Sequence, residues 1–363
     1  MAQLAYSYRI PAWLLVLSLA AWANTALSRQ GVEIREGSIG GALYTVAKPA
    51  TWNGKLLIFA HGLRPESEPL RAGINTDRPL YKTLLEEGWM VATSSYRRNG
   101  IIIADAIEDL NLLRQHITET HGKPGRVVLM GNSMGGIIGA LIAERHGEVY
   151  DAVLAAGAAI RLDVKHGPLS LNFDPKIPIL FLTNRSEIDG PRDYVERSSQ
   201  ATVPAALWRV DRDGHVNVND PERLAAIRAL EHYLDHGELA RHKDGTIAVA
   251  ANSTARFFEN RAEGTIAGVT ANHGNIFTSL VPADLEQLGI EPGDHFLLTV
   301  GEHTVQVLLG SNYGDVERGE WIGIMRAEGV LMIARNRESA CKTLACAMGS
   351  TVVISPLPGH AGQ

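Results

Sequence analysis

The chain of 363 residues has only two cysteines, Cys341 and Cys346. Both lie in residues 339–348, where the sequence predicts a helix, and five positions along a helix separate two Cα atoms by about 8 Å. That separation exceeds the usual span of a disulfide. We therefore expect the two cysteines to be small buried apolar residues that are not joined to each other.

The sequence also lacks a basic block and a long hydrophobic run. It has 34 Lys and Arg against 40 Asp and Glu, a formal charge of −6, so nucleic acid is not an expected partner.

The apolar run at residues 10–20 is shorter than the ~20 residues that span a bilayer. With Arg9 before this run and small residues after it, residues 1–23 are typical of a signal peptide. We expect a periplasmic or secreted protein with no lipid anchor, since no cysteine is near the cleavage site, and no stable membrane insertion after cleavage.

A Gly-Asn-Ser-Met-Gly motif occupies residues 131–135. It follows an apolar run at residues 127–130, suited to a buried parallel strand, and precedes a segment with helical periodicity. Glycines on both sides of Ser133 permit a tight, strained strand-to-helix turn that projects the serine hydroxyl above the sheet. Ser133 is therefore the candidate nucleophile of a nucleophile elbow.

Strands and helices alternate around this motif, after a hairpin at residues 32–47. Because strands separated by helices form mostly parallel sheets with both faces covered, the sequence predicts an α/β fold. The expected strands are residues 55–60, 89–94, 127–130, 151–156, 179–183 and 207–210, and the expected helices are residues 80–87, 103–118 and 221–234.

Partners for Ser133 are sought in loops at the carboxyl ends of strands, where the chemistry of such sheets gathers. His215 follows a glycine just past the last strand and is the candidate base. The acid is expected in the loop after the preceding strand, where Glu187 and Asp189 both qualify. The spacing from the strand end and to Pro191 favours Glu187, with Asp189 as the alternative.

The hydroxyl, the imidazole and the carboxylate act together to activate the nucleophile. A hydroxyl is a poor nucleophile at neutral pH, so an imidazole must take its proton and a carboxylate must orient that imidazole. The backbone N–H groups of Leu63 and Met134 are the candidate donors to the substrate oxyanion. Arg64, Tyr96 and Arg97 lie near strand ends, where lining of the pocket is one interpretation, but solvated surface positions are expected.

Residues 31–236 resemble an α/β-hydrolase of the secreted serine esterase type. The resemblance rests on His61-Gly62, the motif at residues 131–135, the loop with Glu187 and Asp189, and Gly214-His215. It implies a serine hydrolase that forms an acyl-enzyme and uses neither a metal nor an organic cofactor.

The composition changes after residue 236. Residues 237–249 are polar and contain glycine, which predicts a linker. From about residue 250 to 355 short strands separated by turns predict a small mostly β domain, with strands at residues 295–300, 304–309 and 351–354.

This second part resembles the C-terminal domain of S-adenosylmethionine hydroxide adenosyltransferases, through residues 268–278, 312–320 and 329–340. In that family the domain helps to hold the adenine end of the ligand, and an N-terminal domain absent from this chain supplies much of the chemistry. Ala271, His273 and Ser279 stand where the family pattern has other residues. The resemblance therefore implies neither adenosyl transfer nor tight S-adenosylmethionine binding, and favours a structural or oligomeric role.

The sequence thus predicts an exported serine hydrolase of a small-molecule carboxylic ester, capable of forming a homo-oligomer through its β domain. Two alternatives remain open at this stage. One is a binding protein without turnover, built on a hydrolase scaffold with a nucleoside-binding domain. The other is a peptidase or amidase that uses the same three residues.

Overall fold

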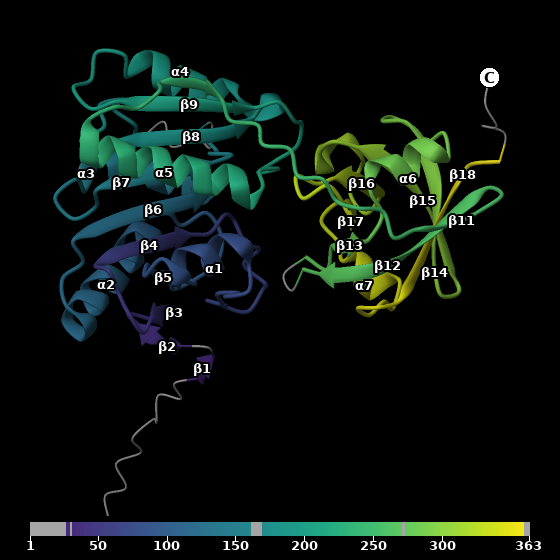
Figure 1. The fold of residues 1–363 in the computed structure, drawn as a ribbon, viewed down its shortest axis with the longest axis horizontal. Coiled ribbons are helices and arrows are strands. Elements are labelled where there is room, and N and C mark those ends of the chain that lie inside the picture. Colours follow the sequence, from purple (N-terminus) through teal and green to yellow (C-terminus); the bar gives the residue numbers. More distant parts are fainter. Residues whose placement is uncertain (1–26, 30, 161–168, 271–272, 359–363) are drawn as a thin grey trace, which may run out of the picture.

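The structure is a computed structural model that describes residues 27–29, 31–160, 169–270 and 273–358. It contains two separate sheets, one of ten strands and one of eight, which form two lobes side by side (Figure 1). The predicted signal peptide lies outside the described residues. Within the described ranges, no helix combines the length and apolarity needed to cross a membrane.

The first sheet has the strand order β1-β2-β3-β5-β4-β6-β7-β8-β9-β10. Its pairs from β5 to β10 are parallel, whereas β1, β2 and β3 extend it as an antiparallel edge. The fold is therefore the mostly parallel α/β sheet that the sequence predicts. The strands are β1 (Leu27–Arg29), β2 (Val32–Ile39), β3 (Ala42–Pro49), β4 (Lys55–Ala60), β5 (Met90–Ser94), β6 (Arg126–Asn132), β7 (Ala152–Ala156), β8 (Ile179–Asn184), β9 (Ala205–Val210) and β10 (His242–Asp244).

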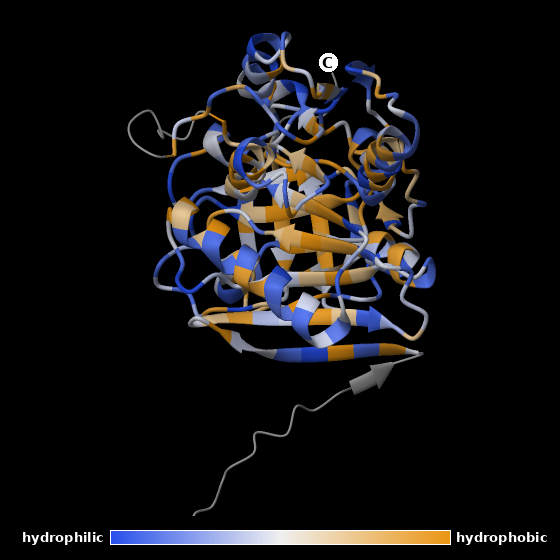
Figure 2. Cartoon of the chain, turned by 90° about the vertical axis from the view of Figure 1, so that its left-hand side faces the viewer, coloured by the Kyte–Doolittle hydropathy of each residue, from blue (hydrophilic) through white to orange (hydrophobic). Residues whose placement is uncertain are grey.

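Helices cover both faces of this sheet. Side chains of α2 (Ile103–His121), α3 (Met134–Arg145) and α4 (Asp189–Arg197) pack in one core cluster, and those of α1 (Pro79–Glu86) and α5 (Asp220–His236) pack in the other. Successive residues of a strand alternate between the clusters, as the two-residue period of a strand requires. Figure 2 shows the apolar strands at the centre and hydrophilic residues on the outer helices.

The segment predicted as a linker contributes to the first sheet. Residues 242–244 form β10, which pairs parallel to β9, and Trp208 Nε1 donates to the carbonyl of Ala240 at 3.0 Å. The sequence gives little sign of this strand, because β10 has only three residues, all exposed, and no apolar alternation. Residues 245–255 then connect the lobes without a helix or strand (Figure 1).

The second sheet closes into a barrel. Its order is β11-β12-β13-β17-β16-β15-β14-β18, and an additional pairing of β12 with β18 joins its ends around one apolar core. Its only α-helices in the described ranges are α6 (Pro282–Gln287) and α7 (Ala340–Thr343). The strands are β11 (Arg256–Phe258), β12 (Arg261–Val269), β13 (Ile276–Thr278), β14 (His295–Val300), β15 (His303–Gly310), β16 (Trp321–Met325), β17 (Leu331–Arg335) and β18 (Thr351–Pro356).

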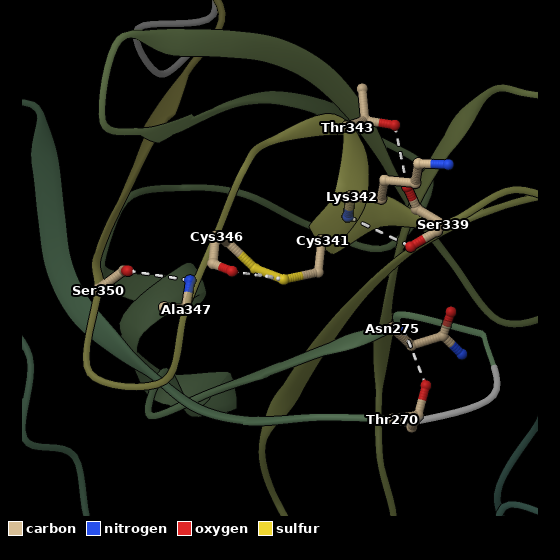
Figure 3. The surroundings of a disulfide bond; sticks show 9 residues. All are labelled: Thr270, Asn275, Ser339, Cys341, Lys342, Thr343, Cys346, Ala347 and Ser350. Carbon is tan, nitrogen blue, oxygen red and sulfur yellow. Dashed lines mark hydrogen bonds between the residues drawn. A yellow bond between two sulfur atoms is a disulfide. The ribbon is translucent and has the colours of Figure 1, made fainter.

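The expectation of unpaired cysteines is wrong, because Cys341 and Cys346 form a disulfide (Figure 3). The predicted helix over residues 339–348 stops at Thr343, and Ala345 takes a left-handed φ of 47°. The chain therefore turns back, the N–H of Cys346 donates to the carbonyl of Cys341 at 3.1 Å, and the two Cα atoms are 5.0 Å apart. A continued helix would have kept them too far apart for this bond.

Replacing both cysteines by serine should lower the free energy of unfolding of the β domain by about 2 kcal/mol, because the bond closes a short loop in the unfolded chain. Amide hydrogen exchange along a denaturant series measures this. Wild-type protein reduced with dithiothreitol is the control and should match the double serine variant. Free thiols in denatured, unreduced protein would contradict the bond.

Candidate active site

Ser133 lies between β6 and α3 in a turn that only glycine neighbours permit. A Cβ on Gly131 would come within 2.0 Å of the carbonyl oxygen of Gly135, and a Cβ on Gly135 within 2.1 Å of the carbonyl oxygen of Ala60. Ser133 has a φ of 55°, in the region that non-glycine residues rarely adopt. This strained backbone is the geometry expected of a nucleophile elbow.

The structure brings Ser133, His215 and Glu187 into one hydrogen-bonded row. His215 Nε2 lies 2.8 Å from Ser133 Oγ, and His215 Nδ1 lies 2.5 Å from Glu187 Oε2. The other oxygen of Glu187 accepts the N–H of Val216 at 3.0 Å. Asp189, the alternative acid, instead begins α4, where Arg192 donates to it at 3.4 Å. The geometry therefore favours Glu187 for the position beside the imidazole.

The loop of Glu187 and the loop of His215 are joined along their length. Arg185 forms two hydrogen bonds with the carboxylate of Asp213, at 2.8 and 2.5 Å. Ser186 accepts the N–H of Gly214 at 2.9 Å. These contacts, one residue after another, bring the carboxylate of Glu187 up to the imidazole.

Gly157, directly after β7, leaves space for the contact between the loop of Glu187 and the loop of His215. Its φ is 52°, and a Cβ there would lie 2.7 Å from both Glu187 Oε1 and Val216 Cγ2. A larger residue would push the carboxylate or the histidine loop away.

The two candidate oxyanion donors come from the segment after β4 and from the start of α3. Met134 is the first residue of α3, where a backbone N–H has no acceptor within the helix. Leu63 follows β4 by three positions, and its neighbour Gly62 packs so closely that a Cβ would be 3.2 Å from Ser133 Cβ. Both backbone N–H groups therefore belong to segments adjoining the nucleophile.

Tyr96 and His61 support the loop that carries Leu63. Tyr96 is fully buried, so the expectation of a surface position is wrong for this residue. Its ring stacks on His61 with centroids 4.0 Å apart, and its hydroxyl donates to the His61 carbonyl at 3.1 Å. The sequence does not indicate the burial of Tyr96. Its backbone has a left-handed φ of 58°, a conformation that depends on the surrounding packing and leaves no local pattern.

The sequence also does not indicate a second support, which holds the residue before Ser133. Arg223 of α5 is buried and donates to the Asn132 side chain at 2.8 Å, directly before Ser133. Burial and the nearby charge of Arg78 lower the pKa of Arg223 to about 10, so the guanidinium is still charged at neutral pH. A buried cation thus holds the residue that precedes the candidate nucleophile.

His61 should make stability depend on pH. Burial and the charge of Arg64 lower its pKa from 6.5 to about 4, against two contacts with backbone carbonyls that favour the protonated ring. The folded state therefore binds fewer protons than the unfolded state between these values. The stabilisation is complete above pH 6.5 and is lost as the pH falls towards 4, on the order of 3 kcal/mol in all.

Denaturant unfolding of wild type and His61→Phe from about pH 4.5 to about pH 7 checks this. The variant should show a shallower loss of stability in acid. Equal slopes for the two proteins would mean that His61 does not contribute to the pH dependence.

Three family models match parts of the chain. Residues 101–229 match serine aminopeptidase S33, residues 41–158 match a tannase-like family of unknown function, and residues 264–353 match the S-adenosylmethionine hydroxide adenosyltransferase C-terminal domain. The first lobe is therefore an α/β-hydrolase domain. The chain joins this hydrolase domain to a domain of the hydroxide adenosyltransferase C-terminal type.

Solved structures are similar at low identity. An uncharacterised conserved protein from Thermotoga maritima is 21% identical over 35% of this chain, with a TM-score of 0.27. A putative dipeptidyl aminopeptidase IV from Bacteroides ovatus is 13% identical over 56% of this chain, with a TM-score of 0.46. The chain covers 48% and 36% of these two proteins.

An esterase from Pyrococcus furiosus is 18% identical over 56% of this chain and 93% of its own, with a TM-score of 0.43. No curated protein matches the sequence.

Proposed function

We propose that this protein is a serine hydrolase that cleaves a small-molecule carboxylic ester through an acyl-enzyme. The observation that carries the proposal is the row of contacts from Ser133 through His215 to Glu187. An imidazole placed between a hydroxyl and a carboxylate can take the hydroxyl proton and remain oriented as it becomes charged.

The reaction would proceed in two halves. His215 Nε2 takes the proton as Ser133 Oγ attacks the ester carbonyl carbon, and the resulting oxyanion accepts from the N–H groups of Leu63 and Met134. His215 then returns the proton to the departing alcohol oxygen as the carbon–oxygen bond breaks. Water, with His215 again as base, hydrolyses the acyl-serine and releases the acid.

An aminopeptidase is the second candidate, because residues 101–229 match the serine aminopeptidase model. Both activities need the same nucleophile and differ in the leaving group, an alcohol or an amine. Purified protein should be assayed on a matched ester and anilide of one acyl group. Because an ester is intrinsically more reactive than an anilide, ester turnover with no measurable anilide turnover supports the first proposal, and turnover of the anilide supports the second.

Export is part of the proposal. It is supported by the sequence of residues 1–23 and by the disulfide of Cys341 and Cys346, since such bonds persist mainly in oxidising compartments. N-terminal sequencing of protein recovered from the periplasm or medium would test it.

Ser133→Ala should abolish ester turnover and leave the fold intact. Loss of such a nucleophile commonly removes on the order of 10⁴-fold or more of the rate. A fluorophosphonate probe, which labels only an activated serine, should modify wild type and leave the variant unlabelled. Circular dichroism serves as the folding control. Wild type that is neither labelled nor active would instead favour a binding protein without turnover.

Glu187→Gln should lower kcat by far more than Asp189→Asn. Glu187 contacts His215 Nδ1 and the Val216 N–H, whereas Asp189 lies at the start of α4, where it pairs with Arg192. The amide of glutamine cannot stabilise the positive charge that forms on the imidazole. Steady-state kinetics of the two variants measure the difference, and the reverse ranking would assign the acid to Asp189.

A further inference from the structure

The β domain contacts the hydrolase domain on both sides of His215. On one side, a Cβ on Gly214 would lie 3.2 Å from the carbonyl oxygen of Ser311, so the two backbones pack closely there. On the other side, Arg326 Nη2 donates to the carbonyl of Val216 at 3.3 Å. The loop that carries the imidazole is thus held between two segments of the second sheet domain.

Two buried asparagines extend this contact. Asn217 Oδ1 accepts the N–H of Ala327 at 2.8 Å, and Asn217 Nδ2 donates to the carbonyl of Met325 at 3.1 Å. Asn219 Nδ2 donates to the carbonyl of Ala327 at 3.2 Å. Both asparagines are only 1% exposed, so water cannot replace a lost partner and a broken bond leaves a buried polar group unsatisfied.

The segment that makes these bonds has backbone hydrogen bonds of its own. Residues 325–327 lie at the end of β16, where the chain turns into β17. In that turn the N–H of Arg326 donates to the carbonyl of Val330 and the N–H of Gly329 donates to the carbonyl of Arg326, both at 2.9 Å. The β domain therefore presents a fixed edge to the histidine loop.

The histidine loop needs such support. Residues 211–219 contain no helix or strand, and Val216, a β-branched residue directly after His215, has a φ of 50°. A strained conformation of this kind persists only where the surroundings hold it. Within the hydrolase domain Asn217 also exchanges hydrogen bonds with Asn184 at the end of β8, so it links the first sheet to the β domain.

We infer that the β domain is a positioning element for His215, with Asn217 and Arg326 as its positioning residues. The inference rests on the proposed serine hydrolase function. The second domain would then contribute geometry to catalysis: it holds the imidazole between Ser133 and Glu187 without touching the reacting atoms.

The test uses the full chain. Arg326→Met retains the apolar stem and removes the donor to the Val216 carbonyl. Asn217→Asp has the same shape but can donate neither to Met325 nor, within its own loop, to the carbonyl of Asp213, so Arg326→Met is the more specific of the two variants. Each should lower kcat by about 10- to 100-fold, since a small misplacement of a catalytic group has costs of this size, with KM within about 2-fold. Arg326→Lys should recover part of the loss. The double variant should lose less than the product of the single losses, because both act on one loop.

The cysteine-to-serine double variant is the matched control, because it weakens the β domain without touching the histidine loop. Its kcat should equal that of wild type. If Arg326→Met and Asn217→Asp behave like this control, the inference is wrong. If Asn217→Asp does not fold, the kcat values of Arg326→Met and Arg326→Lys alone test the inference.

A second measurement needs no turnover. The proton between His215 Nδ1 and Glu187 should give a low-field proton resonance in wild type that is absent from Glu187→Gln. It should shift or broaden in Arg326→Met and stay unchanged in the cysteine control. An inactive, unlabelled wild type would overturn the hydrolase proposal, whereas an active wild type with an unperturbed resonance in Arg326→Met would overturn the positioning inference alone.

Discussion

The site depends on how closely α3 approaches the sheet. A Cβ on Gly131 would clash with the backbone at the start of α3, and a Cβ on Gly135 would clash with the end of β4. Gly136 packs against Ala158 in the same way, since a Cβ there would lie only 2.6 Å from the Ala158 Cβ. This approach sets the left-handed φ of Ser133 and places the serine hydroxyl at the carboxyl edge of the parallel strands. Every other group of the site then has to reach that point from its own strand end, which is why the supporting contacts are made by loops.

Much of the first domain follows from its sequence alone. The apolar run of β4 at residues 55–60 and the glycines around Ser133 encode their structure locally, since period, length and backbone freedom all agree. The row of Ser133, Glu187 and His215 could be anticipated because parallel strands deliver their loops to one edge. Between Glu187 and Asp189, contacts of the neighbouring residues Arg185 and Ser186 with the histidine loop favour Glu187, which they bring up to the imidazole.

The misses share a physical cause: tertiary packing overrode the local pattern. The helix expected at residues 339–348 ends early because Ala345 adopts a left-handed conformation, and that reversal is what lets the two cysteines meet. Tyr96 was expected at the surface because neither its left-handed backbone nor its stacking on His61 produces a hydrophobic periodicity in the sequence. The strand β10 is too short and too polar to show as a strand, and it forms because β9 offers an unpaired edge.

Three of the non-glycine residues with positive φ gather around the site, namely Tyr96, Ser133 and Val216. Each is held differently. The glycines of the elbow hold Ser133, and burial against His61 holds Tyr96. The N–H of Val216 donates to Glu187, and the Val216 carbonyl accepts from Arg326. Of these supports, only the hydrogen bond from Arg326 comes from the β domain. The positions where the second domain departs from its family pattern, such as His273 and Ser279, lie outside residues 325–327, which hold the histidine loop. The contacts of the β domain with the histidine loop therefore do not involve these departing positions, and the positioning role that we infer for the domain does not depend on its binding a ligand.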